Sequence, residues 1–100
     1  MSKQANMLKK MQESFAKMQA ELEQKTVEGT AGGGMVTVTV NGHMKVMKIN
    51  INPDIIKDGD KEILEDMIIA AVNNGMEKAQ QLMQTEMSKI TGGLPIPNMF

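Results

Sequence analysis

Four groups of residues in this sequence have types and spacings that could support chemistry: a glycine triplet, a run of carboxylates, a single histidine and a set of lysines. The triplet Gly32-Gly33-Gly34 is compatible with a phosphate-binding loop. A P-loop, however, leads into a helix and ends in Gly-Lys-Ser/Thr, whereas these glycines lead into an alternating, strand-like pattern. The triplet therefore indicates a bulge, or a close backbone crossing at a sheet or dimer seam.

Six carboxylates suggest a calcium site: Asp54, Asp58, Asp60, Glu62, Glu65 and Asp66. An EF-hand loop that began at Asp54 would need a polar ligand two residues later, where Ile56 stands. Helix capping and a solvated helix face explain the same residues, so we expect no metal. His43, the one histidine, has no positioned nucleophile, and the chain has no cysteine for thiolate or zinc chemistry. We therefore expect neither an enzyme nor a cofactor.

The charges are unevenly distributed, although the formal net charge is only −1. Residues 1–20 carry four lysines and one glutamate, whereas residues 54–86 carry eight acidic side chains and three lysines. All eleven basic residues are lysines, which bind phosphate as point charges but lack the planar fork that reads guanine edges. Any nucleic-acid contact should therefore go mainly to the backbone. A solvated helix face is the alternative explanation of the same lysines.

Two long helices should hold these residues in place. In the first segment, apolar residues recur at intervals of three and four, which is typical of a coiled-coil stripe: Leu8, Met11, Phe15, Met18 and Leu22. This pattern predicts a helix from about Lys3 to Lys25 that packs on the second helix or on another chain. The second helix should run from about Lys61 to Ile90, capped by Asp58 or Asp60. Its MIIAAV segment, residues 67–72, is apolar on nearly all sides, which implies burial on more than one face.

Between the helices, the sequence predicts a β-hairpin. Asn41-Gly42 favours a two-residue turn that pairs Val40 with His43 and Val36 with Met47. One face of this hairpin is then apolar, formed by Val36, Val38, Val40, Met47, Ile49 and Ile51. Asn52-Pro53 should end the sheet, and the segment from Val27 to Ala31 can form a third strand.

A sheet this small cannot cover two long helices, so we expect a homodimer. Its interface should come from the sheet and the apolar half of the second helix, at Val36, Val38, Met47, Ile49, Ile68 and Val72. The chain begins with polar residues, and no apolar run approaches the roughly 20 residues that span a bilayer. These features indicate a cytoplasmic protein without a membrane partner or a small-molecule substrate.

Several segments of the sequence are similar to those of one protein family. They are MLKKMQ at 7–12, VEGTAGGGMVTVTVNG at 27–42, KININPDII at 48–56, DKEILEDMIIAAVNNGMEKA at 60–79 and MSKITGGLPIPNMF at 87–100. Together they resemble the YbaB/EbfC family of bacterial nucleoid-associated proteins. The resemblance implies an α+β fold, with an α-β-β-β-α protomer in an intertwined homodimer, and one domain over residues 1–93 before an apolar, Pro-containing tail at 94–100. It also implies binding to double-stranded DNA in the nucleoid, linked to recombination and repair or to gene regulation.

The resemblance also implies that projecting helices contact the DNA. In this sequence the matching cations are Lys3, Lys9, Lys10, Lys17, Lys78 and Lys89. The alternative is a protein-binding coiled-coil module, such as a prefoldin-like holdase, which the twelve methionines and the lack of arginine also fit. The MIIAAV segment and the Pro-containing tail favour a compact dimer core over two plain coiled-coil arms.

Overall fold

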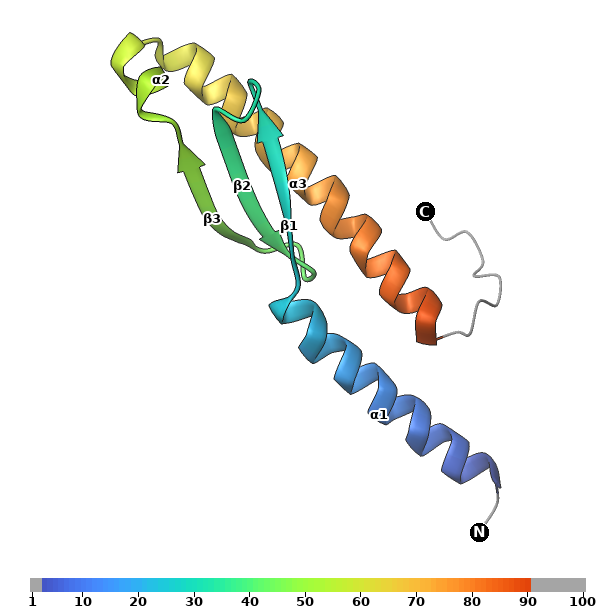
Figure 1. The fold of residues 1–100 in the computed structure, drawn as a ribbon. Coiled ribbons are helices and arrows are strands. Elements are labelled where there is room, and N and C mark those ends of the chain that lie inside the picture. The colour runs from blue at the N-terminus through green and yellow to red at the C-terminus, as the bar shows by residue number, and fades with distance from the viewer. Residues whose placement is uncertain (1–2, 91–100) are drawn as a thin grey trace.

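The protomer is a three-stranded antiparallel sheet flanked by long helices (Figure 1). The computed structural model describes residues 3–90, and the predicted tail at 94–100 lies outside them. The order is α1 (Lys3–Gln24), β1 (Thr26–Ala31), β2 (Val36–Asn41), β3 (Val46–Ile51), α2 (Pro53–Asp58) and α3 (Lys61–Ile90). The predicted α-β-β-β-α arrangement, including the third strand, is confirmed. Within the described residues, no helix is both long and apolar enough to cross a membrane.

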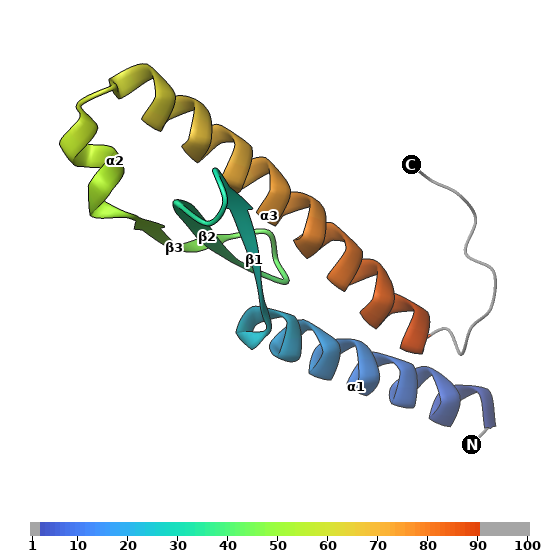
Figure 2. The ribbon, with the colours of Figure 1, turned by 45° about the horizontal axis from the view of Figure 1, so that its top comes forward.

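The core lies between the sheet and α3, which runs across β1 and β2 (Figure 2). Val36, Val38 and Val40 point at this helix and are fully buried, as are Ala71 and Ala79 on α3. The helix comes so close at Gly29 of β1 that a Cβ there would overlap main-chain atoms of α3. The close backbone crossing therefore occurs at Gly29, and the glycine triplet instead forms the turn between β1 and β2, with all three φ angles positive.

The predicted hairpin register is wrong by four residues. Val38 pairs with Ile49 and Val36 with Ile51, and a bulge near Val40 places Val46 opposite it. The reason is a longer loop: the side-chain oxygen of Asn41 accepts hydrogen bonds from two loop amides, at 2.9 and 3.0 Å, and stabilises a turn over residues 42–45. Since side chains alternate with a period of two, an even shift leaves Ile49 on the same face as the valines.

The sequence does not predict the short helix α2, since Asn52-Pro53 indicates only the end of the sheet. Asn52 is its N-cap and accepts from the Asp54 amide at 2.9 Å, while Pro53 occupies the first turn. The boundaries of α3 agree with the prediction, and Asp60 is the residue that caps it, accepting from the Ile63 amide at 3.1 Å.

Helix α1 contacts β2 and α3, and its N-terminal end projects away from the sheet (Figure 1). Of its predicted apolar stripe, Met18 and Leu22 are buried. The Gly42 amide donates to the Leu22 carbonyl at 2.8 Å, and the His43 ring lies 2.8 Å from the Gln19 carbonyl oxygen, forming a hydrogen bond. The β2–β3 loop therefore holds the base of α1, and the helix forms an arm.

Candidate nucleic-acid interface

The arm carries a row of exposed lysines. Lys3, Lys10 and Lys17 are seven residues apart on one helix, so they share one side of it at intervals of about 10 Å. Lys9 is exposed beside Lys10. Glu13 is the one acidic residue among the first twenty, which leaves this part of the chain with a surplus of three positive charges.

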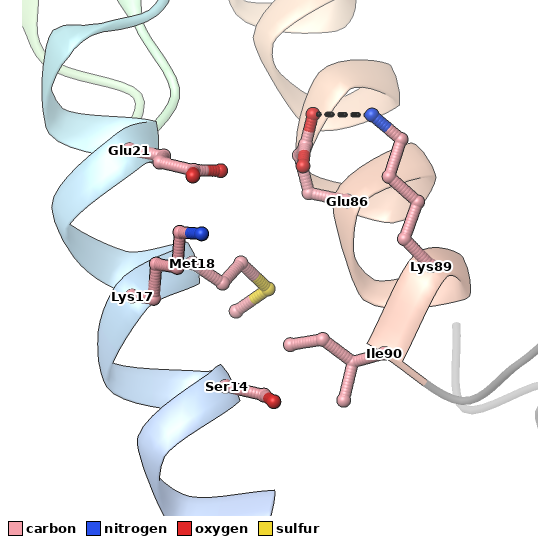
Figure 3. Close-up of a pocket in the computed structure, with 7 residues that line it drawn as sticks. All are labelled: Ser14, Lys17, Met18, Glu21, Glu86, Lys89 and Ile90. Atoms are coloured by element: carbon pink, nitrogen blue, oxygen red, sulfur yellow. Dashed lines mark hydrogen bonds and ion pairs between the residues drawn. The ribbon is translucent and has the colours of Figure 1, made fainter.

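Two of the predicted DNA-contacting lysines line a cleft between α1 and α3 (Figure 3). We call it the α1–α3 cleft; it is an open space of about 280 Å³ lined by Ser14, Lys17, Met18, Glu21, Glu86, Lys89 and Ile90. Lys17 belongs to α1 and Lys89 to the last turn of α3, so the cleft brings together cations that are far apart in the sequence. Lys78 lies elsewhere, and its amine donates to the Glu28 carbonyl oxygen of β1 at 2.9 Å.

Glu86 is the cleft residue that sequence reasoning missed. Among the side chains that the structure describes, it is the only charged one that is buried, at 5% exposure. Its Oε1 atom accepts from the Lys25 amine at 2.6 Å and from the Lys89 amine at 3.2 Å. The hydrogen bond from Lys25, followed in size of effect by that from Lys89, holds the pKa of Glu86 below its usual value. The bond between Lys25 and Glu86 also raises the pKa of Lys25. A signal was present, because Glu86 occupies an inward-facing place in the apolar pattern that Met83 and Ile90 continue.

The predicted dimer-interface residues divide into two groups. Val36 and Val38 are fully buried inside the protomer, and Ile68 and Val72 are half-buried against the same core. Their part in an interface stays a prediction.

Met47 and Ile49 are 55% and 44% exposed, and both lie on β3, which is an edge strand of the sheet. On the arm, Leu8, Met11 and Phe15 are also exposed, and together with Ile90 of α3 they line an open apolar groove.

Among the side chains that the structure describes, no three from histidine, aspartate or glutamate are placed to hold a metal ion. Asp60 serves as a helix cap, as described above, and Asp54 lies in the first turn of α2, where a negative charge is favourable. His43 ties a loop to α1. These residues therefore have structural roles in the fold.

Fold and site together define a class, a small α+β protein whose helical arm presents a row of amines to solvent. Comparison with known proteins narrows the class. The model of the YbaB/EbfC DNA-binding family matches residues 1–94, and the chain belongs to this family.

Two relatives illustrate the match. Nucleoid-associated protein TTE0040 of Caldanaerobacter subterraneus is 51% identical over 98 residues, covering 95% of this chain and 88% of that protein. Nucleoid-associated protein Teth39_2199 of Thermoanaerobacter pseudethanolicus is 52% identical with the same coverage. The crystal structure of the uncharacterized protein HP0035 from Helicobacter pylori has the same fold, with a TM-score of 0.77 at 21% identity, over 92% of this chain and 99% of that one.

Proposed function

We propose that this protein is a non-enzymatic, homodimeric DNA-binding protein of the bacterial nucleoid, and that its α1 arms contact duplex DNA mainly at backbone phosphates. Membership of a DNA-binding family and relatives named nucleoid-associated proteins support the proposal. The observation that carries the contact mode is the row of lysines on the projecting arm.

The spacing of the lysines suits a duplex backbone. A duplex carries one negative charge for about every 1.7 Å of its axis, so amines about 10 Å apart find phosphates in any sequence. Lysine amines form point contacts, and the chain has no arginine to read base edges bidentately. Binding should therefore depend little on DNA sequence and strongly on salt.

The proposed dimer uses the edge of β3. Edge strands present unpaired backbone N–H and C=O groups, and this one also exposes Met47 and Ile49. Pairing two such edges would continue the sheet across two protomers and cover these side chains. The two arms would then lie a fixed distance apart, with twice the positive charge for the duplex.

A gel-shift titration with two matched triple variants tests the contact mode. Replacing Lys9, Lys10 and Lys17 by alanine should weaken duplex binding by more than tenfold at about 50 mM salt, because three phosphate contacts are lost. The control replaces Lys45, Lys57 and Lys61 by alanine. These lysines are exposed and lie outside α1, and their replacement removes the same amount of charge. Equal affinities for the two variants would rule out the arm as the contact surface, and absence of duplex binding by the wild type at low salt would rule out the function.

The exposed apolar stripe of the arm favours a second candidate function, that of a holdase. Leu8 is 60% and Phe15 47% exposed, which is what an arm that grips unfolded chains would require. Suppression of the aggregation of a denatured client that is lost in Leu8→Ser/Phe15→Ser, and kept in the lysine triple variant, would favour this candidate.

The cellular process that DNA binding serves is proposed to be recombination and repair or gene regulation. The recombination frequency and the transcript profile of a deletion strain test these two.

A further inference from the structure

The buried carboxylate of Glu86 has two amine partners, and their positions differ. Lys25 lies 2.6 Å from Oε1, its side chain is 42% exposed, and it connects α1 to β1. Lys89 lies 3.2 Å from the same oxygen, its side chain is 65% exposed, and it is three residues along the same helix. Ion pairs three residues apart on a helix contribute little to stability, and the Lys89 amine is the more distant and the more exposed of the two partners, so Lys89 can leave Glu86 at the lower cost.

One amine is enough to balance one carboxylate. If Lys89 turns away, Glu86 keeps the shorter bond from Lys25 and is not left as an unpaired buried charge, which would be costly. Lys89 and Lys17 line the same cleft from facing helices (Figure 3). Both ion pairs found among the described side chains end on Glu86, so the Lys17 amine takes part in neither.

We propose that the α1–α3 cleft is a seat for one DNA phosphate between Lys17 and Lys89, and that Glu86 limits its affinity by holding Lys89 in the free protein. This inference rests on the proposed function and adds a particular site and an internal competitor to it. When a phosphate enters, Lys89 exchanges the Glu86 carboxylate for a phosphate oxygen while Lys25 stays on Glu86. Because one ion pair replaces another, Lys89 contributes less to binding than Lys17 does.

The test is a duplex titration of Glu86→Gln, which keeps the side-chain volume and removes the charge. Gaining one effective phosphate contact should raise the affinity about threefold at ~50 mM salt, with most of the gain lost by ~200 mM. The matched control is Glu21→Gln, since Glu21 lines the same cleft from α1 and, in the described part of the chain, forms no ion pair with Lys89. Equal gains in the two variants would show that only net charge matters and would overturn the proposal.

Lys89→Ala completes a double-mutant cycle. It should have little effect in the wild type and in Glu21→Gln, and it should abolish the gain in Glu86→Gln. A lower affinity in Glu86→Gln, or additive effects in the cycle, would also overturn the proposal.

A second variant covers the case in which Glu86→Gln does not fold, as judged by circular dichroism. Lys25→Gln leaves Lys89 as the partner of Glu86, so it should weaken duplex binding. An unchanged affinity would contradict the competitor role.

Failure of the proposed function is distinguishable from failure of this inference. If the wild-type protein binds duplex and the substitutions of the cycle leave its affinity unchanged, the inference alone is refuted. If neither the wild type nor the variants bind duplex, both the inference and the proposed function are refuted. A carboxyl-carbon NMR titration, without DNA, should show a higher pKa of Glu86 in Lys89→Ala than in the wild type. An unchanged pKa would mean that the two side chains do not interact in solution.

Discussion

Gly29→Ala is expected to be strongly destabilising, although it adds only one methyl group. The added Cβ would overlap the Ala71 carbonyl oxygen and the Gly75 amide nitrogen. Both are main-chain atoms of α3 and cannot rotate aside, so the helix must move away from the fully buried valines of β2. Overpacking costs about 1–3 kcal/mol, and a clash with rigid backbone belongs near the upper limit.

For a domain of this size, about 3 kcal/mol corresponds to a fall in Tm of roughly 12–24 °C. Differential scanning calorimetry at one fixed protein concentration measures it, since dimerisation would make Tm depend on concentration. The control is Gly33→Ala, where an added Cβ meets no atom within 4 Å but φ is +67°. Its cost should be only about 1–2 kcal/mol of backbone strain. A Tm of Gly29→Ala equal to or above that of Gly33→Ala would refute the proposed backbone crossing.

Three further changes test other parts of the structure. Leu22→Ala should cost about 2–5 kcal/mol in chemical denaturation, because the side chain is 1% exposed at the base of the arm; an unchanged midpoint would mean that α1 is not anchored there. Asn41→Ala should cost about 1–3 kcal/mol, because two loop amides lose their acceptor, and hydrogen exchange should be faster in residues 42–45. The Glu86 ion pairs should stabilise the fold above pH 4.5, the ordinary pKa of the group, and this contribution should vanish as the pH falls through the lower folded-state pKa. Acid unfolding of Glu86→Gln should lack this component, and identical pH profiles for the two proteins would contradict it.

The long helices were predictable because their signals are local. Apolar spacing defined α1, and the cap at Asp60 together with the pattern up to Ile90 defined α3. The register of β3 was not predictable, because Asn41-Gly42 suits a two-residue turn. Only the hydrogen bonds of the Asn41 side chain select the longer loop. Helix α2 had a recognisable start at Asn52-Pro53, but its six residues are too few to show a period.

The candidate site divides in the same way. The lysines of α1 follow from the sequence, because spacing along one helix determines which side chains share a side. The cleft does not follow from the sequence, because it depends on the angle at which α1 leaves the sheet. That angle places Lys17 and Lys89 on the lining of one cleft, and it lets Lys25 bond to Glu86, 61 residues further along the chain.

Binding of duplex phosphates by lysines on the α1 arm should appear in the salt dependence of affinity. The decisive measurement is duplex affinity against salt concentration, on protein of known oligomeric mass, for the wild type and for Lys9→Ala/Lys10→Ala/Lys17→Ala. If these lysines bind phosphates, the protein is a dimer whose log affinity falls linearly with log salt, and the slope of the triple variant is shallower by about three for each arm that contacts the duplex. An identical slope for the two proteins would contradict this binding.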